Sequence, residues 1–486
     1  MSGGIIAVAI IFSWITLTIA VGVLAGIKRK FSLEGYLVSG RTLGTILLYT
    51  LFAAEIYSAY AFLGTAGWAY SFGAPILYAF AYGAVAYAFG YFYAEYVWRA
   101  GKKFGYVTQA DYFAHRYRSK LLGIFTALIG IIFILPYLQL QLQGLGYILH
   151  VASLGKISVN TAIILSTIAI LAYVYTSGLR GIAWTNFLQG IFMFVIAWGI
   201  VFAVPYIHFG GVTELFKKLL ETKPQMLYLH PPLGIPWYLS TIVLCGLGFF
   251  LWPHGWPTIY SSKNIKSLKK TYVILPLYSF FMLPVVLAGL TIAALGVKLS
   301  IPDEAIMKAI EISYPKWVLG IVGAAGFAAA ASTASALILA IAGLTSSNIY
   351  KIAKPTASDR ELVLVSRLSV VAYSIIVILL ALYARGRLVP LLLLGYAGIT
   401  QMFPGAVVGM FWKKANKWSV LAGLIAGLIT ITYLKFFGPG NYLGIHFGLW
   451  GLAVNFIVFT IASMLSQGDP GFEEFSRGLK EKEESA

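Results

Sequence analysis

Long, continuously apolar blocks follow one another along almost the whole chain, separated by short polar segments. Each block has about the length of the roughly 20-residue helix that crosses a lipid bilayer. The strands of a transmembrane barrel would instead alternate apolar and polar residues over about ten positions. The pattern therefore predicts an all-α integral membrane protein with about 13 transmembrane helices, each placed to within a few residues. The predicted spans are 4–27, 43–71, 75–98, 121–149, 159–178, 181–206, 236–260, 271–296, 317–343, 363–384, 388–412, 418–436 and 443–466.

Composition supports the membrane class. Of the 486 residues, 59% are hydrophobic and only 11% are charged, whereas about a quarter of the residues of a soluble protein are charged. The net charge of +18 does not indicate nucleic-acid binding, because the cations lie in the short gaps between apolar blocks, where the positive-inside rule explains them. The single cysteine, Cys245, excludes a disulfide within the chain and a cysteine-based metal site.

The charges around the first block predict how the chain enters the membrane. Residues 1–4 carry no charged side chain and three cations follow the block at 28–30, whereas a secretory signal has its charge in front. Most of the 35 lysine and arginine residues then fall on one side. This places the amino terminus outside and the carboxyl terminus in the cytoplasm, across a plasma or inner membrane. The longest outside loop contains a predicted amphipathic helix at 212–221, and the tail after Gln467 is predicted to be solvated.

One acidic residue, Glu55, is predicted to lie deep within a span. It belongs to a stretch at 53–67 that is crowded with small and hydroxylated residues and contains two glycines. Ionisable groups at membrane depth are costly, and exposed backbone there is tolerated only where it lines a cavity or meets protein. The alternative is a tight helix–helix contact between small residues. Such a contact does not need a carboxylate, so the stretch favours a binding site.

A second interruption is predicted five spans later, at 248–258. Pro253, Gly255 and Pro257 cannot continue a regular helix, because each proline lacks an N–H group and clashes with the preceding turn. Broken helices at the first and the sixth core span are the pattern expected of a five-helix inverted repeat, whose unwound segments face each other near the midplane.

A third feature combines small and hydroxylated residues in the ninth span. Ser332 and Thr333 follow Ala329 by three and four residues, so the three residues share one helical face. A backbone carbonyl and two hydroxyls provide half of a small-cation site, since hard cations prefer oxygen ligands. Carbonyls freed by the break near Ala54 and Tyr57 would complete it. The alternative is that the small residues only allow close packing.

These stretches, in this order, resemble the sodium:solute symporter family, and the match covers most of the chain. That family has a LeuT-like fold of two inverted five-helix repeats with one extra amino-terminal helix. Four further motifs in register carry the resemblance: the first cytoplasmic loop at 35–44, the entry to core helix five at 178–189, the exit of core helix eight at 346–351, and the end of core helix ten at 403–416.

The resemblance implies a division of the chain into four parts. They are an amino-terminal helix and loop at 1–42, a first repeat at 43–206, a second repeat with its outside loop at 207–412, and two carboxyl-terminal helices with a cytoplasmic tail at 413–486.

The resemblance also implies a sodium site, which agrees with the site built from spacing. It would use the carbonyls of Ala54, Tyr57 and Ala329 and the hydroxyls of Ser332 and Thr333.

Two residues qualify the implied coupling. Many relatives have aspartate where this chain has Asn186, and in some that aspartate serves a second sodium site, so a second site here is doubtful. Glu55 would sit one residue from an ion-site carbonyl, where a carboxylate can bind a proton instead. Sodium is therefore the expected coupling ion, and the proton is the alternative.

For the solute, the runs at 55–64 and 136–146 resemble the branch that carries monocarboxylates such as lactate and pyruvate and, in some members, small amino acids. The resemblance implies that Ser58 and Phe62 contact the solute. A small organic anion would want hydrogen-bond donors or a positive helix end. The candidate donors are Gln141, Trp252, His254, Trp256 and Gln401.

Packing and helix–helix hydrogen bonding explain the glutamines and the histidine equally well. No arginine or lysine is predicted deep in a span, so a zwitterion or a neutral solute remains an alternative to an anion.

The other classes of membrane protein fit less well. A channel would repeat a selectivity motif around a pore, a sensor would need a signalling domain, and a membrane enzyme would need clustered catalytic side chains. We therefore expect a cation-coupled secondary transporter without enzymatic activity or a resident cofactor. Its partners would be a small organic solute, Na⁺ and the lipid bilayer, without nucleic acid.

Overall fold

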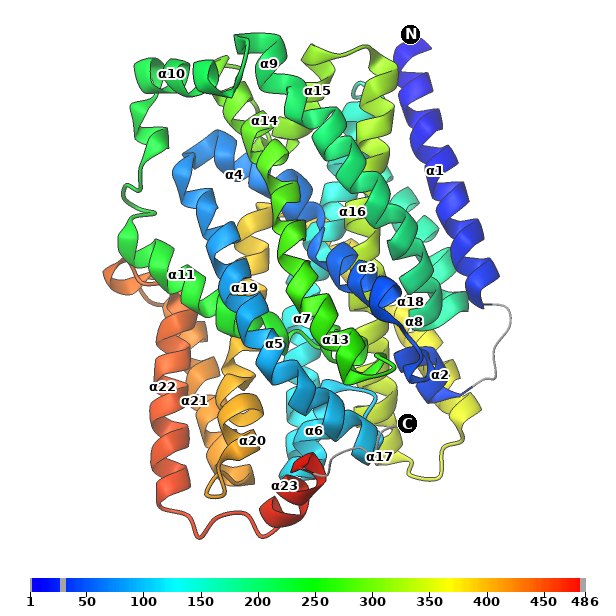
Figure 1. The fold of residues 1–486 in the computed structure, drawn as a ribbon, viewed down its shortest axis with the longest axis vertical. Coiled ribbons are helices and arrows are strands. Elements are labelled where there is room, and N and C mark those ends of the chain that lie inside the picture. Colours follow the sequence, from blue (N-terminus) through cyan, green and yellow to red (C-terminus); the bar gives the residue numbers. More distant parts are fainter. Residues whose placement is uncertain (1, 27–31, 481–486) are drawn as a thin grey trace.

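The computed structural model describes residues 2–26 and 32–480. Its long helices run side by side between an upper and a lower face in Figure 1, with the start of the first helix at the upper face. For a few residues inside helices, among them Ala54 and Glu55, only the backbone is described. The cation cluster at 28–30 lies outside the described residues, and the predicted orientation of the termini stays a prediction.

Among the described residues, the first half of the chain forms ten α-helices in sequence order. They are α1 (Ser2–Gly26), α2 (Leu33–Val38), α3 (Thr45–Ile56), α4 (Thr65–Phe72), α5 (Tyr78–Phe104), α6 (Gln109–Arg116), α7 (Lys120–Ala152), α8 (Val159–Gly199), α9 (Val204–Phe209) and α10 (Val212–Thr222).

The second half continues with thirteen helices. They are α11 (Ile235–Gly248), α12 (Gly255–Tyr260), α13 (Ile265–Ile274), α14 (Met282–Ala294), α15 (Ala305–Ser313), α16 (Lys316–Gly343), α17 (Lys351–Ala353), α18 (Asp359–Tyr383), α19 (Leu388–Ile399), α20 (Gly409–Phe411), α21 (Lys417–Phe436), α22 (Phe447–Met464) and α23 (Phe472–Lys480).

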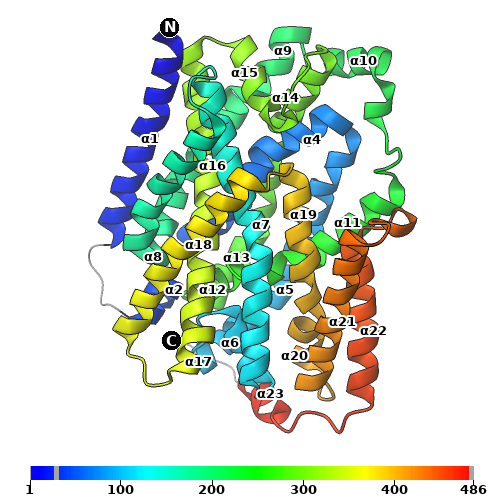
Figure 2. The same cartoon turned by 180° about the vertical axis from the view of Figure 1, so that it is seen from behind.

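The prediction of a multi-pass helical protein is confirmed. Ten helical segments in the described part are long and apolar enough to cross a membrane. The other predicted spans correspond to the shorter apolar helices Val159–Leu171 and Ile235–Leu251 and to the broken segment α3–α4. The predicted number of 13 is thus an approximate count, because it depends on how broken helices are divided. Viewed from behind, α16 and α7 run through the middle of the molecule (Figure 2).

The predicted interruption of the first core helix lies at Tyr57 and Ser58, between α3 and a π-helical turn at Tyr60–Gly64. A new helical start leaves backbone N–H groups without intrahelical partners. Two of them are satisfied by side chains. The Ala61 N–H donates to Ser58 Oγ at 3.3 Å, and the Ala59 N–H donates to Gln141 Oε1 at 2.7 Å.

The second predicted interruption lies between α11 and α12, where Trp252 adopts an extended backbone (φ −61°, ψ 125°). Backbone hydrogen bonds join the two broken helices. The Leu43 N–H donates to the Ser261 carbonyl at 2.9 Å, and the Lys263 N–H donates to the Leu43 carbonyl at 3.0 Å. The start of the first broken helix is therefore tied to the end of the second.

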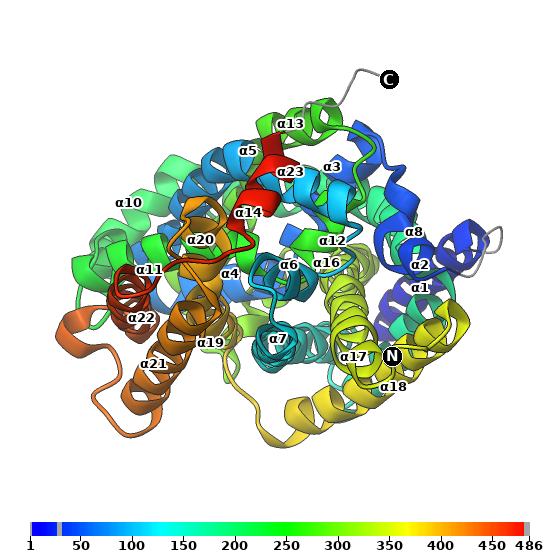
Figure 3. The same cartoon turned by 90° about the horizontal axis from the view of Figure 1, so that it is seen from below.

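Two predictions about segments outside the core have different outcomes. The amphipathic helix at 212–221 is confirmed as α10, which buries Leu215 and Leu219. The prediction of a solvated tail is wrong for α23, because Phe475 and Leu479 are buried. Spaced four residues apart, they give the helix one apolar face, and α23 lies across the lower face next to α5 and α6 (Figure 3).

Candidate cation and solute site

Four oxygen atoms converge where the break in the first core helix faces α16. The hydroxyls of Ser332 and Thr333 lie 3.4 and 3.3 Å from the Tyr57 carbonyl oxygen. The same hydroxyls lie 3.0 and 3.5 Å from the Ala329 carbonyl oxygen. All four residues are almost completely buried. The structure therefore brings together four of the five residues that the sequence proposed as cation ligands.

Local geometry explains why these oxygens meet. Tyr57 ends α3 with a non-helical backbone (φ −76°, ψ 88°), so its carbonyl is released from the helical pattern. Its side chain is fixed from the other side, because the hydroxyl donates to the Tyr278 carbonyl at 2.7 Å and the ring lies 4.1 Å from that of Phe281. On α16, the hydroxyls of Ser332 and Thr333 point back toward the preceding turn, as serine and threonine do within helices.

The fifth proposed ligand and the carboxylate candidate are only partly described. Ala54 and Glu55 belong to the last turn of α3, and the side chain of Glu55 lies outside the described part of the structure. Asn186, where relatives have aspartate, is fully buried on α8, and neither polar atom of its side chain has a hydrogen-bond partner among the described residues.

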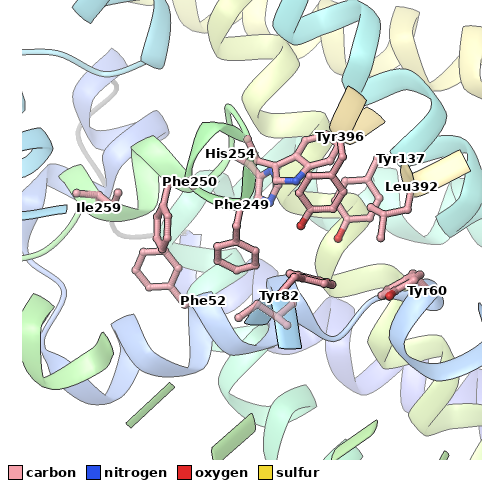
Figure 4. Close-up of a pocket in the computed structure, with 13 residues that line it drawn as sticks. Phe52, Tyr60, Tyr82, Tyr137, Phe249, Phe250, His254, Ile259, Leu392 and Tyr396 are labelled. Carbon is pink, nitrogen blue, oxygen red and sulfur yellow. The ribbon is translucent and has the colours of Figure 1, made fainter. Parts of the chain in front are cut away.

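A cavity of about 40 Å³ lies beside this cluster and is lined from both broken helices (Figure 4). Ile56, immediately before the proposed cation ligand Tyr57, is part of its wall. The other lining residues come from α3, the π turn, α5, α7, α12, α19 and the segment after α11: Phe52, Tyr60, Tyr82, Tyr137, Phe249, Phe250, Trp252, His254, Gly255, Ile259, Leu392 and Tyr396.

Aromatic rings dominate one end of this cavity. The Trp252 ring lies 4.8 Å from that of Tyr137 and 5.2 Å from that of Tyr396, and Tyr82 lies 5.9 Å from Tyr396. These distances are in the range of favourable aromatic pairs. His254 adjoins the group, 6.0 Å from Trp252. In Figure 4 the rings of Tyr137 and Tyr396 lie close together above Tyr82.

Of the residues predicted to contact the solute, Trp252 and His254 line the cavity. Ser58 and Gln141 do not; their oxygen atoms hold the backbone of the restarted helix, as described above. Phe62 packs against α16, where a Cβ at Gly326 would come within 2.6 Å of its ring.

The remaining two predicted solute residues use their polar atoms within the protein. The Trp256 indole N–H donates to the Phe250 carbonyl at 2.7 Å. Gln401 donates to the carbonyls of Ala397 and Gly448 at 2.9 and 3.2 Å, which links α19 to α22. The structure does not bring these two side chains to the cavity.

Sequence reasoning missed several lining residues, notably Tyr60, Tyr82, Leu392 and Tyr396. The chain contains 31 tyrosines, and many of them lie in apolar spans. No local signal separates a tyrosine that faces a cavity from one that packs in the core. Only the juxtaposition of α5 and α19 with the two breaks identifies them.

A buried carboxyl group, Asp303, joins three separate segments of the fold. Asp303, in the connection between α14 and α16, is 2% exposed and accepts from the Leu388 N–H at the start of α19 at 3.1 Å. Its backbone packs on α4, where a Cβ at Gly67 would come within 2.8 Å. Burial raises the pKa of the Asp303 carboxyl to about 6, although the Leu388 N–H and the Arg387 guanidinium oppose the rise.

Two further cavities lie near the central one. His254 also lines a second, narrow cavity of about 10 Å³ between α12 and α16. Val107 is shared by this cavity and a third, of about 550 Å³, next to α6. The three cavities are separate, but neighbouring cavities share wall residues.

The known proteins that this chain resembles in sequence include symporters, transporters and permeases. The profile of the sodium:solute symporter family matches residues 36–427. The uncharacterized symporter YhjB of Bacillus subtilis is 34% identical over 88% of each chain. More distant relatives include the osmoregulated proline transporter OpuE of the same organism (27% identity, 90% of this chain and 91% of OpuE). Another is a monocarboxylate transport permease protein of Rhizobium johnstonii (25% identity, 94% of this chain and 96% of the permease).

The fold is shared with a solved transporter. A Na⁺-coupled sialic acid symporter, solved in a substrate-bound outward-open state, superposes with a TM-score of 0.81 over 95% of this chain and 98% of the symporter, at 19% identity. The likeness confirms the predicted LeuT-like fold class.

Proposed function

Because the chain belongs to the sodium:solute symporter family, we propose that it imports a small organic solute by Na⁺-coupled alternating access. The family supports Na⁺-coupled symport by a multi-pass membrane transporter; the ion site, the solute and the direction are our proposals. One observation carries them: the hydroxyls of Ser332 and Thr333 lie 3.4 and 3.3 Å from the carbonyl oxygen of Tyr57, at the break of the first core helix.

The chemistry of this cluster suits a monovalent hard cation. Its four oxygens are neutral carbonyls and hydroxyls, whereas divalent cations usually demand carboxylates. An ion held between Tyr57 and Ser332 would tie the broken helix to α16. It would thereby favour the conformations in which these two elements lie together, because a ligand shifts an equilibrium only through its preference for one state. Solute bound in the neighbouring cavity would share that preference, which couples the two.

Two classes of solute have support. The sequence resemblance and the Rhizobium relative favour a monocarboxylate such as lactate or pyruvate, for which His254 offers a donor at the cavity wall. The proline transporter among the relatives favours a small amino acid. None of the described residues that line the cavity is an arginine or lysine, and a buried carboxylate without a counter-charge is costly. A solute without net charge therefore fits the cavity better.

Proton coupling is the alternative for the ion and rests on Glu55, which belongs to the last turn of α3 next to the proposed site. A carboxylate at this position would couple transport to protons only if it took up and released a proton in each transport cycle. Glu55→Gln separates the two possibilities, because Na⁺ coupling through neutral oxygens survives the change and proton coupling does not.

The test is transport by the purified protein in proteoliposomes. We expect uptake of a labelled amino acid or monocarboxylate when Na⁺ is higher outside, and little uptake with K⁺ or with a pH gradient alone. Counterflow, in which unlabelled solute inside drives entry of labelled solute, identifies a carrier because a channel does not exchange. Uptake driven by a pH gradient and indifferent to Na⁺ would contradict the Na⁺-coupled symport proposed here.

A further inference from the structure

The aromatic end of the central cavity points to the chemical group that the solute carries. Tyr82, Tyr137, Trp252 and Tyr396 form a connected set of rings, with neighbouring centroids 4.8–5.9 Å apart. They come from four separate parts of the chain, α5, α7, the second break and α19. The aromatic wall therefore exists only in the folded protein, where these four elements come together.

The electrostatics of this wall favour a cation over an anion. The face of an aromatic ring is negative and its edge positive, so rings attract ammonium groups that approach their faces. Among the described residues, the cavity lining includes no arginine, lysine, aspartate or glutamate; the side chain of Glu55, next to the lining residue Ile56, lies outside the described part. A bare carboxylate would find no fixed positive charge there. An ammonium group over a ring face regains part of the hydration free energy that it loses.

The same ring-lined end of the cavity also offers a hydrogen-bond donor. His254 lines the wall next to the ring set, 6.1 Å from Tyr137 between ring centroids. Its Nδ1 atom is buried and has no hydrogen-bond partner among the described residues. A buried polar atom without a partner is unusual in native structures. An imidazole N–H can satisfy a carboxylate oxygen, and the solute's own ammonium then supplies the counter-charge.

We propose that the cavity selects a compact ammonium carboxylate, with its ammonium group among the rings of Tyr82, Tyr137, Trp252 and Tyr396 and its carboxylate toward His254. This proposal rests on the proposed function and narrows it to one solute class. The volume of about 40 Å³ restricts the solute to a small one, since a single water already needs roughly 10–15 Å³ of such space.

The decisive comparison uses pairs of solutes that differ only in the ammonium group. Alanine and lactate differ in an ammonium against a hydroxyl, and proline and cyclopentanecarboxylate differ in a ring NH₂⁺ against a CH₂. Thermal stabilisation of the purified full-length protein by each is measured over a range of concentrations, in Na⁺ and in K⁺. We expect the ammonium member of at least one pair to bind at least tenfold more tightly in Na⁺.

Variants of the tyrosines distinguish the contribution of the ring face to binding from that of the hydroxyl group. We expect Tyr396→Phe to keep the preference for the ammonium member and Tyr396→Leu to reduce it at least fivefold. Tyr82→Phe and Tyr82→Leu provide a second pair if the leucine variant of Tyr396 does not fold.

Several results would overturn the proposal. They are equal or tighter binding of the member without the ammonium group in both pairs, stabilisation by neither pair, or an unchanged preference in the leucine variants. A preference for the ammonium member that does not depend on Na⁺ would support the aromatic ammonium site and count against Na⁺ coupling. Failure of this proposal and failure of the proposed function can therefore be told apart.

Discussion

Replacing Thr333 with valine tests the cation cluster most sharply, because it removes one oxygen and almost preserves the shape of the side chain. Thr333 is fully buried, and its hydroxyl lies 3.3 Å from the Tyr57 carbonyl oxygen. A hydrogen bond to a charged group contributes about 1.5–3 kcal/mol, and we take the same range for a hydroxyl that ligates an ion. At 1.4 kcal/mol per factor of ten, the half-saturating Na⁺ concentration should rise roughly ten- to a hundredfold.

The assay needs no knowledge of the solute. Na⁺ that binds the folded protein stabilises it by about 2.7 kcal/mol at a hundred times its dissociation constant, whereas a site a hundredfold weaker retains only about 0.4 kcal/mol at the same concentration. We therefore expect Na⁺ titrated against K⁺ to raise the thermal midpoint of the wild type and scarcely that of Thr333→Val.

Two variants serve as controls for this experiment. Thr333→Ser keeps the hydroxyl and should keep most of the Na⁺ response. Thr291→Val removes an equally buried hydroxyl, which donates to the Leu287 carbonyl within α14 at 2.8 Å, and should leave the response intact. An unchanged half-saturating Na⁺ concentration in Thr333→Val would refute the assignment of this hydroxyl as a ligand.

Two further predictions concern buried charges outside the membrane spans. Asp469 pairs with the fully buried guanidinium of Arg116, so Asp469→Asn should cost about 3–5 kcal/mol of stability. Glu474→Gln, which breaks a pair between exposed side chains, should cost less than about 1 kcal/mol; equal losses in the thermal midpoints of the two variants would contradict this reasoning. Asp303 has its folded pKa raised from 3.8 to about 6, so its contribution to stability is complete below pH 4 and is lost as the pH rises through 6. Asp303→Asn should flatten this fall in the thermal midpoint between pH 4 and 7, and the same slope as the wild type would count against it.

The sequence predicts the broken helices because their causes are local. Prolines at 253 and 257 cannot continue a helix, and the small residues around Tyr57 mark backbone that must meet protein. Helical spacing also places Ala329, Ser332 and Thr333 on one face, and the structure turns that face toward the break. What each interruption faces is decided by tertiary packing, and the sequence could propose it only because two interruptions and one polar face occur together.

The solute cavity was less predictable than the ion cluster. Gln401 and Trp256 are polar side chains at membrane depth, and so they looked like donors, but they bond to carbonyls within the protein. A polar group within a span must find a partner, and the sequence does not say whether that partner is a solute or a neighbouring helix. Tyr82 and Tyr396 were missed for the converse reason, since an aromatic residue fits a core and a cavity wall equally well.

The packing of the carboxyl-terminal helix α23 and the burial of Asp303 both depend on contacts between segments that are distant in the sequence. Arg116 and Asp469 are more than 350 positions apart, and nothing around either residue marks it as one half of a buried pair. Asp303 likewise lies in a short connection that looks solvent-exposed in the sequence. Its burial follows from the approach of α4 and α19, which only the assembled fold supplies.

The central claim is that oxygens from an unwound helix and from α16 together hold Na⁺. It is tested most directly by determining the structure of the full-length protein at high resolution, once in Na⁺ and once with N-methylglucamine as the only cation. We predict a Na⁺-dependent density within coordinating distance of the carbonyl oxygens of Tyr57 and Ala329 and the hydroxyls of Ser332 and Thr333. Na⁺-dependent density elsewhere, with this cluster unchanged between the two conditions, would contradict the account.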